Sequence, residues 1–374
     1  MTKLAPTAVT EQSGDVVVLS TGDIRVAQHD PGAVPAARRA DQPYRSPAGD
    51  RALREAITAY AADGGTATFT PDQVVVTPGA RQAIFTALLS VLRGDRREVL
   101  LPTPYWASFP RLVEMAGGTP VPVPTEPGQG APSLEALARL TTGRTAMLIL
   151  NSPRNPDGAV VSAEELRGIT EWTAERGLTL LFDQVYRGVA LYEEPAPSVT
   201  QLYPELPGHV VLTDGLTKSH ALAGLRLGWA VAGPDTAARI TATASHLIGG
   251  ASGVVQDIAQ QVLTTGEPGR RELGARLATH LDLALDAFAG IPGVHCARPA
   301  GGIFLFPDLR GWLADSAPPQ AREDLVGWLR TRHEVAVVDG AAFGAPGHLR
   351  LSFALPADQL KDGLHRLRTA LTRP

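Results

Sequence analysis

Between residues 74 and 233, seven short apolar runs alternate with segments of helical periodicity, and this alternation limits the folds that the chain can adopt. The runs are rich in Val, Leu and Ile: VVVT (74–77), EVLLP (98–102), PVPVP (120–124), AMLILN (146–151), LTLLFD (178–183), HVVLTD (209–214) and GWAVAG (228–233). Continuous apolarity is typical of strands that are covered on both faces. We therefore expect an α/β fold with a mostly parallel seven-stranded sheet, flanked by helices and joined by right-handed crossovers.

The segments between these runs carry the signals that begin and end helices. Ser162 and Glu165 have the spacing of a capping box, and Gly177 follows as a typical helix stop. Apolar residues recur on one helical face between these signals, and they do so again over residues 83–91. The middle of the chain therefore has the pattern of βαβ units.

A second pattern begins near the end of this region. Helical periodicity extends over residues 254–288, and a closing amphipathic helix is expected over Ala357–Leu371. We expect short strands between them, at VHCARP (294–299), IFLFPD (303–308), VAVVDG (335–340) and HLRLSFAL (348–355). This part of the chain predicts a second, smaller α+β lobe.

The composition excludes several classes of protein. The net charge of −4 is spread over both signs, so no basic surface is available for nucleic acid or anionic lipid. No apolar run approaches the roughly 20 residues that cross a bilayer, and the first residues lack the apolar core of a secretory signal. The single cysteine, Cys296, cannot form an intrachain disulfide or a cysteine-based metal cluster. We expect a cytoplasmic protein without nucleic-acid, membrane or metal partners.

Polar and aromatic residues gather directly after the apolar runs. In such a sheet the ligand lies beyond the carboxyl ends of the strands, so these residues are candidates for one site. Gly79, Ala80 and Arg81 fall at a helix start, where free amides favour a phosphate. The other candidates are two aromatic rings, an amide, a carboxylate, a phenol and two cations: Tyr105, Trp106, Asn155, Asp183, Tyr186, Lys218 and Arg226. Each alone has an ordinary structural explanation, but together they predict a site.

Lys218 is the residue whose type says most about the ligand. It is one of only three lysines, and the other two, Lys3 and Lys361, lie near the ends of the chain. A neutral primary amine can form an imine with an aldehyde, whereas a guanidinium stays protonated. We therefore predict a planar, phosphorylated aromatic aldehyde bound to Lys218, with the pKa of the amine lowered by burial and by Arg226.

These residues lie in motifs that resemble the fold type I pyridoxal-phosphate enzymes, and within them the class I/II aminotransferases. The motifs span nearly the whole chain: YRSPAGDRALREAI, PGARQA, PTPYW, NSPRNPDG, FDQVY, TKSHALAGLRLGW and HLRLSF. The resemblance implies that pyridoxal 5'-phosphate (PLP) serves to move an α-amino group between an amino acid and a 2-oxo acid. It also implies a homodimer with shared active sites, a large PLP-binding domain over residues 41–275, and a small domain built from segments 1–40 and 276–374.

The resemblance also implies a role for each candidate residue. Lys218 would hold the cofactor as a Schiff base and move the α-proton of the substrate, while Asp183 would pair with the ring nitrogen. Tyr186 and Asn155 would donate to the 3'-oxygen of the ring. Arg350 would bind the substrate α-carboxylate. The remaining expected contacts are ring stacking by Trp106, substrate contacts by Gly22 and Asn155, and phosphate binding by Arg226, Thr217, the amides of Gly79, Ala80 and Arg81, and Tyr44 of a neighbouring subunit.

The chain departs from the usual pattern of this family at three places. Gly215 stands where a phosphate-binding Ser is usual, so Thr217 or Thr213 replaces it or the phosphate is held less tightly. Asp157 stands where Thr is usual, which is a conservative change in turn chemistry. Because only about twenty residues precede Gly22, we expect the helix that crosses the active site in many relatives to be missing. The mouth of the site would then be more open, or another segment would cover it.

Other functions and several substrates remain open at this stage. The same cofactor supports elimination, cyclisation or oxidation of an unusual amino acid. A regulatory PLP-binding domain would need a DNA-binding module, and a nicotinamide dehydrogenase would need G-x-G-x-x-G after a strand. Arg25 could receive an acidic substrate side chain or be merely solvated, and His220 could approach the ring or pack behind its loop. An open mouth would favour a bulky or polar amino acid from a specialised pathway.

Overall fold

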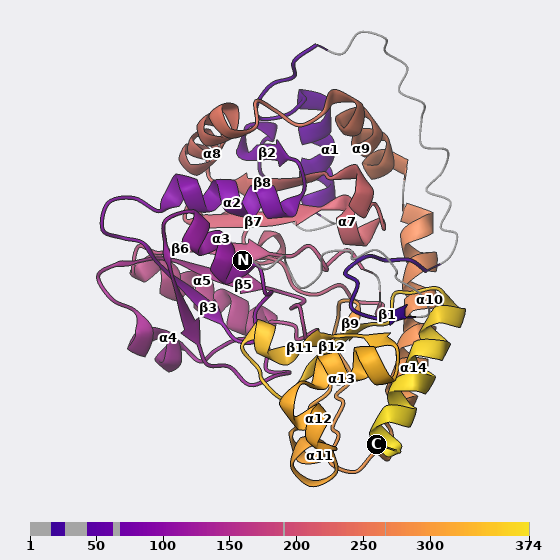
Figure 1. Ribbon diagram of the computed structural model, residues 1–374. Coiled ribbons are helices and arrows are strands. Elements are labelled where there is room, and N and C mark those ends of the chain that lie inside the picture. The colour runs from indigo at the N-terminus through magenta and orange to yellow at the C-terminus, as the bar shows by residue number, and fades with distance from the viewer. Residues whose placement is uncertain (1–15, 27–42, 63–67, 190, 266, 374) are drawn as a thin grey trace.

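The computed structural model describes residues 16–26, 43–62, 68–189, 191–265 and 267–373. These residues form two lobes: a large lobe around a seven-stranded sheet, and a smaller lobe in the lower right of Figure 1. Within the described residues, no helix combines the length and the apolarity that crossing a bilayer requires.

The seven predicted runs form the seven strands of the large sheet, in the order β2-β8-β7-β6-β5-β3-β4. Strands β3 to β7 are parallel to one another, whereas β8 runs antiparallel to both β2 and β7. The strands are β2 (Val74–Thr77), β3 (Glu98–Pro102), β4 (Thr119–Val123), β5 (Thr145–Asn151), β6 (Thr179–Asp183), β7 (Val210–Gly215) and β8 (Gly228–Ala232). The predicted mostly parallel sheet is therefore confirmed.

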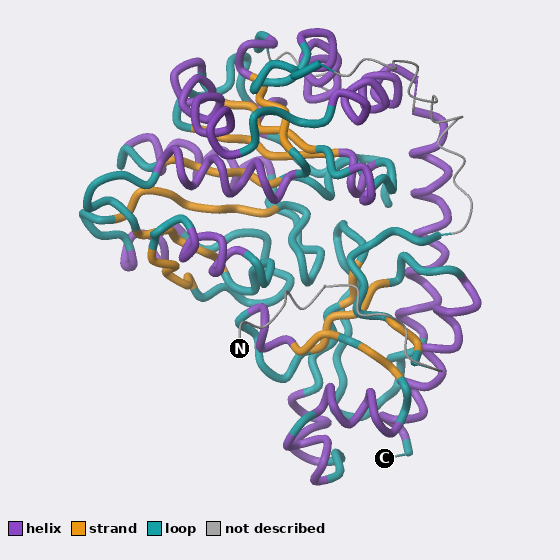
Figure 2. Tube along the Cα trace, turned by 45° about the horizontal axis from the view of Figure 1, so that its top comes forward, coloured by secondary structure: helices purple, strands orange, loops and turns teal. Residues whose placement is uncertain are grey.

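Helices cover both faces of this sheet, which explains why its strands read as continuous apolar runs. Leu148 and Leu150 of β5 pack in one core with the first group of helices, while Met147 and Ile149 pack in another core with the second group. Figure 2 shows the strands as a layer between helices. The first group is α1 (Arg51–Ala62), α4 (Leu134–Leu140), α5 (Ala163–Glu175), α6 (Val199–Leu202) and α9 (Gly253–Thr265), and the second is α2 (Ala80–Val91), α3 (Phe109–Met115) and α8 (Pro234–Leu247).

The predicted capping box at the start of α5 is present. Ser162 Oγ accepts a hydrogen bond from the Glu165 amide at 3.2 Å, and Glu165 Oε2 accepts one from the Ser162 amide at 2.8 Å. Leu166, Ile169 and Trp172 are buried on the inner face of this helix. Local sequence and tertiary packing therefore favour the same helix boundary.

The smaller lobe joins both ends of the described chain. β1 (Val17–Val18) pairs in parallel with β10 (Val335–Ala336), and an antiparallel sheet has the order β11-β12-β9. The other elements are β9 (Phe304–Leu305), β11 (Val338–Asp339), β12 (Leu349–Ser352), α10 (Glu267–Asp286), α11 (Arg310–Asp315), α12 (Pro319–Glu323), α13 (Leu325–Arg332) and α14 (Ala357–Thr372). In Figure 1, α14 runs beside α10 along the right edge of this lobe.

The strand expected over residues 294–299 is wrong. Pairing there is limited to a bridge between His295 and Asp308. Pro292 and Pro299 bracket the segment, and proline cannot donate to a strand ladder. The division of the chain at residues 40 and 275 stays a prediction, and residue 275 lies within α10.

The two lobes meet closely at a pair of glycine-containing loops. Gly158 has φ +69°, and a Cβ atom added there would lie 2.4 Å from both the Gly301 carbonyl oxygen and the Pro299 Cβ. A Cβ at Gly301 would in turn lie 2.6 Å from the Pro153 side chain. The loop over residues 152–159 therefore packs directly against the small lobe, and the contact leaves no room for a side chain at Gly158 or Gly301.

Candidate active site

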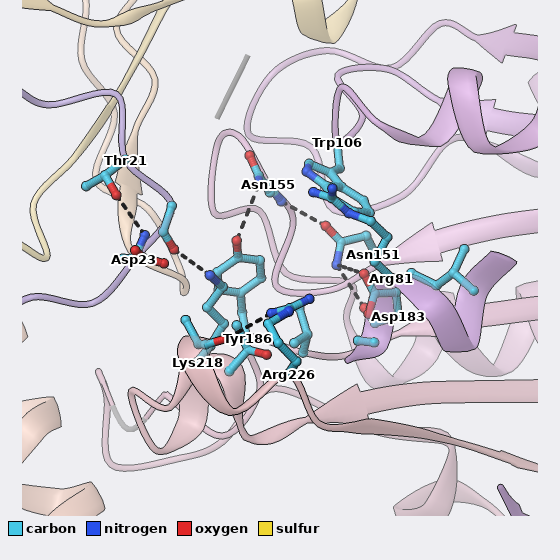
Figure 3. Close-up of a pocket in the computed structure, with 16 residues that line it drawn as sticks. Thr21, Asp23, Arg81, Trp106, Asn151, Asn155, Asp183, Tyr186, Lys218 and Arg226 are labelled. Atoms are coloured by element: carbon cyan, nitrogen blue, oxygen red, sulfur yellow. Dashed lines mark hydrogen bonds between the residues drawn. The ribbon is translucent and has the colours of Figure 1, made fainter. Parts of the chain in front are cut away.

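The carboxyl ends of the strands surround a cavity of about 200 Å³. Its lining includes most of the residues that the sequence predicts for the site, and Figure 3 draws the lining residues and labels ten of them. The lining residues that were predicted are Gly22, Ala80, Arg81, Trp106, Asn155, Asp183, Tyr186, Thr217, Lys218 and Arg226. The strand-end argument therefore locates a real concavity.

The Lys218 amine points into this cavity from α7 (Leu216–Ser219), the short helix that follows β7. Burial lowers its pKa to about 8, and Arg350, Arg226 and Arg81 act in the same direction, while the Asp23 carboxylate opposes them. The amine donates a hydrogen bond to the Gly22 carbonyl. Lys218 is therefore neutral over a much wider pH range than an exposed lysine, as imine formation requires.

Asp183 ends β6 and lies buried at the base of the cavity. Thr213 Oγ1 donates to one carboxylate oxygen at 3.2 Å, and Asn151 Nδ2 lies 3.3 Å from the other. Burial raises the pKa of Asp183 to about 7, and the neighbouring Asp214 adds to this effect. A cationic ring nitrogen placed here would find a carboxylate without a cationic partner of its own among the described residues.

The opposite part of the cavity is suited to a phosphate. Ala80 and Arg81 begin α2, so their amides belong to the first turn, where N–H groups lack an acceptor within the helix. The Arg226 guanidinium lies against this turn, since a Cβ atom added at Gly79 would come within 2.7 Å of its Nη2. The amide of Gly79 itself donates to the Thr77 carbonyl at 2.7 Å. Of the three predicted amides, those of Ala80 and Arg81 are placed to serve an anion.

Gly215, which replaces the usual Ser, leaves no space for a side chain. A Cβ there would lie 2.8 Å from the Leu227 carbonyl oxygen and 2.9 Å from the Gly228 Cα. Of the two proposed substitutes, Thr213 is bonded to Asp183, whereas Thr217 lines the cavity. Thr217 is therefore the hydroxyl that is available to a ligand.

Asn155 connects the two lobes above the cavity. Its Nδ2 donates to the Tyr186 hydroxyl at 3.3 Å, and its Oδ1 accepts from Arg350 Nη1 at 3.2 Å. Burial raises the pKa of Tyr186 above its ordinary value, so the phenol stays protonated. On the cavity wall, the Arg81 guanidinium lies 4.9 Å from the Trp106 ring centroid. These side chains supply donors and a flat aromatic surface for a planar ligand.

Arg350 lies behind the cavity wall and not in it. The residue is fully buried, its Nη2 donates to the Ser20 carbonyl at 2.8 Å, and its guanidinium lies 4.2 Å from the Phe304 ring centroid. Burial lowers its pKa to about 10. Among the described residues, its Nε has no hydrogen-bond partner. A carboxylate could accept a hydrogen bond from this nitrogen if the segment around Ser20 moved away.

Four further predicted residues lie outside the cavity. Tyr105 lines a separate small hollow. Tyr44 is fully exposed and borders a separate hollow beside residues 248–254. Arg25 is not among the described residues that line the cavity, and its amide donates to the Ala354 carbonyl. His220 packs behind the loop, bonded to Ser219 at 2.8 Å and in contact with the Tyr60 ring. The second interpretation of His220, that it packs behind its loop, is therefore confirmed.

Sequence reasoning missed several residues of the site. Asp23 and Thr21 line the cavity beside Gly22, and Asn151 lines it at the end of β5. Asn151 had the same strand-end position as the predicted residues, so that signal was available. Asp157 bonds to the buried guanidinium of Arg154, with Nε at 2.8 Å, and accepts the Gly128 amide at 2.8 Å. Asp157, which stands where Thr is usual, thus forms a buried ion pair with Arg154, which turn chemistry alone did not predict.

Known proteins resemble the chain over almost its full length. The model of the family "Aminotransferase class I and II" matches residues 14–367. An aspartate aminotransferase of Geobacillus stearothermophilus is 32% identical over 98% of this chain and 96% of the relative. The structure of an aspartate aminotransferase from Thermus thermophilus with maleate has a TM-score of 0.85 at 31% identity, covering 96% of this chain and 92% of that one. An aromatic aminotransferase from Pyrococcus horikoshii has a TM-score of 0.86 at 26% identity and covers 96% of both chains.

Proposed function

Since the chain belongs to the class I and II aminotransferase family and is an aminotransferase, we propose that it binds PLP at Lys218 and moves an α-amino group between an amino acid and a 2-oxo acid. One observation carries this proposal. A single cavity joins the buried amine of Lys218, the Asp183 carboxylate, which has no cationic partner in the described part of the chain, and the first turn of α2 beside Arg226. These are the three groups that an aldehyde, a ring nitrogen and a phosphate need.

The residues present fit the cofactor. Gly79 supports this fit, because any side chain there would displace the Arg226 guanidinium from the first turn of α2. When bound, PLP supplies an electron-withdrawing ring that stabilises negative charge on the substrate α-carbon. Lys218 Nζ is then the base that moves the α-proton, and Asp183 keeps a proton on the ring nitrogen. Asn155 and Tyr186 provide hydrogen bonds to the ring oxygen.

Arg350 is the proposed partner of the substrate α-carboxylate. Among the residues that the structure describes, its Nε has no hydrogen-bond partner and its Nη2 bonds to the Ser20 carbonyl, so a carboxylate that replaces Ser20 could form a two-pronged hydrogen bond. Because the arginine is sealed behind Ser20 and Asn155, substrate binding would have to displace this part of the N-terminal segment.

We propose a dicarboxylic amino acid, such as aspartate, as one substrate. The names of several relatives support this choice, and the Thermus structure was obtained with the dicarboxylate maleate. Arg81 is the cation available on the cavity wall for a second carboxylate, whereas Arg25, the earlier candidate, does not reach the lining. A bulky or polar amino acid from a specialised pathway is the competing choice, and the substrate panel described below separates the two.

The homodimer and the cytoplasmic location are also proposals. Tyr44 is fully exposed on this chain, and in the proposed dimer it would complete the phosphate site of the second copy. Analytical ultracentrifugation tests the dimer, and a mixture of Tyr44→Ala and Lys218→Ala chains tests the shared site by the recovery of PLP binding. The single cysteine supports a reducing compartment.

The test of function is amino transfer with a panel of donors and acceptors. Purified protein loaded with PLP should convert a 2-oxo acid into its amino acid only when a donor amino acid is present, and Lys218→Ala should abolish this. Highest turnover with aspartate or glutamate would support the dicarboxylic substrate. Release of ammonia or peroxide without a new amino acid would instead indicate elimination or oxidation, and would overturn the proposal.

A further inference from the structure

We propose that Asn151 is a positioning residue that holds the Asp183 carboxylate and the Asn155 loop together as one unit. The inference rests on the proposed function, because Asp183 and Asn155 act on the ring only if PLP binds here. Asn151 is the first residue of the NSPRNPDG motif, but the resemblance assigns no role to it.

Three neighbouring strands place one residue each in a row at this edge of the sheet. Asn151 ends β5, Asp183 ends β6, and Thr213 lies opposite Asp183 on β7. Asn151 Nδ2 donates to the Asp183 main-chain carbonyl at 2.9 Å and lies 3.3 Å from its Oδ2, while Thr213 approaches Oδ1. The carboxylate is thus fixed from both sides by polar groups of adjacent strands.

The other end of the same amide holds the loop. Asn151 Oδ1 accepts the Asn155 amide hydrogen at 2.9 Å. Figure 3 shows Asn151 between Asn155 and Asp183, with hydrogen bonds to both. Because Asn155 in turn contacts Tyr186 and Arg350, the bonds form a chain from the ring-nitrogen partner to the α-carboxylate partner.

Only a short amide satisfies both ends at this position. The nitrogen must face two oxygens of Asp183, and the oxygen must face an N–H group, so the orientation of the amide is fixed by its partners. An aspartate would place a second carboxylate against Asp183, and an alanine would leave a buried amide and a buried carboxylate oxygen without this partner. The side chain is buried at the base of the cavity.

The groups that act electrostatically on Asp183 define what a substitution would change. Burial and the Asp214 carboxylate favour the protonated form of Asp183, while Thr213 and the Val185 amide favour the ionised form. Tyr186, the nearest phenol, is kept protonated by its own burial. Either loss of the Asn151 donor or addition of a charge at this position would favour a protonated Asp183, which cannot stabilise a charged ring nitrogen.

The test compares Asn151→Asp and Asn151→Ala with a matched control, Thr173→Ala, which removes a buried hydroxyl that donates to the Ile169 and Thr170 carbonyls of its own helix. Equilibrium PLP binding, thermal unfolding and the pH profile of kcat/KM are measured for each. We expect PLP affinity and kcat/KM to fall about 10- to 100-fold in both Asn151 variants, by analogy with the residues that orient metal ligands, whose mutation typically costs this much. The acidic limb of the pH profile should also move to higher pH, which a merely structural role would not cause.

The outcomes separate the inference from the proposed function. If either Asn151 variant folds and keeps the PLP affinity and pH profile of the unmodified protein and of Thr173→Ala, the positioning role is overturned. If one variant does not fold, the other decides. If the unmodified protein itself does not bind PLP, the proposed function fails, and the inference fails with it for that separate reason.

Discussion

The ε-amine of Lys218 donates a hydrogen bond to the carbonyl oxygen of Gly22. Lys218 belongs to the large lobe, whereas Gly22 lies in a segment that is bound to the small lobe on both sides. Ser352 donates to the Leu19 carbonyl at 2.8 Å, and the Arg25 amide donates to the Ala354 carbonyl at 2.7 Å. The nitrogen proposed to react with PLP is therefore also a point of contact between the lobes.

The lowered pKa of Lys218 predicts the pH dependence of PLP uptake. Only the neutral amine reacts, and its pKa of about 8 means that the rate constant of uptake should rise with pH and level off above this value. A lysine with an ordinary pKa would give rates that continue to rise toward about pH 10.4. Stopped-flow absorbance after mixing the PLP-free protein with PLP measures this profile. A rise that continues past pH 9 would contradict the shift.

Substitution Asp23→Asn should move this profile to lower pH. The Asp23 carboxylate is the largest influence that raises the pKa of Lys218, so its loss leaves burial and three arginines to lower the pKa further. Asp282→Asn is the matched control, since it removes the same charge from an exposed ion pair with Arg298. An unchanged midpoint in Asp23→Asn would show that the carboxylate does not act on the amine.

Substitution Arg350→Gln should weaken the use of every α-amino acid. Removal of one partner from a buried, charged hydrogen-bonded pair costs about 2–5 kcal/mol, so kcat/KM should fall by roughly 30-fold or more. Arg350→Lys keeps the positive charge but cannot form the two parallel hydrogen bonds of a guanidinium, so its kcat/KM should stay almost as low as that of Arg350→Gln. Amines without an α-carboxylate serve as the internal control, because their slow turnover should not fall in parallel. An equal loss for such amines would show a general effect on the fold.

Substitution Gly158→Ala should destabilise the protein. The new Cβ would overlap the Gly301 carbonyl and Pro299 at a backbone φ of +69°, and overpacking of this kind typically costs about 1–3 kcal/mol. Gly168→Ala is the matched control: this glycine lies within α5 with open space around it, so alanine should raise stability by about 0.5–1 kcal/mol. Urea denaturation measures both, and the two changes should have opposite signs.

Substitution Ser162→Ala should remove one end of the capping box and lower the free energy of unfolding by about 1 kcal/mol. Ser162→Asp should retain most of the stability, because aspartate also caps a helix. The helix lies away from the cavity, so kcat/KM should stay unchanged in both variants. A loss of activity without a loss of stability would contradict this assignment.

The sequence predicted the large lobe well because its signals are local. Continuous apolar runs reflect burial on both faces, and the residues after each run reach the same edge whatever the details of packing. Trp106, Asp183 and Lys218 could be grouped on this basis alone. The small lobe was predicted less well, since its strands are two to four residues long and depend on distant partners.

Contacts between distant segments could not be predicted from the sequence. Nothing local to Arg350 indicates that Asn155 and the Ser20 carbonyl bury it, and nothing local to Gly215 indicates that β8 leaves no room for a side chain. The ion pair of Arg154 with Asp157 was also missed, although these residues are only three positions apart. It depends on the turn that brings the two side chains together.

The pairing of β1 with β10 also sets an order of events during synthesis. Val17 is translated long before its partner Val335. The nascent chain can complete the seven-stranded sheet, with Lys218 and Asp183 in place, while β1 is still unpaired. The segment that carries Gly22 at the edge of the cavity can therefore bind the small lobe only after residues 335–354 have been made.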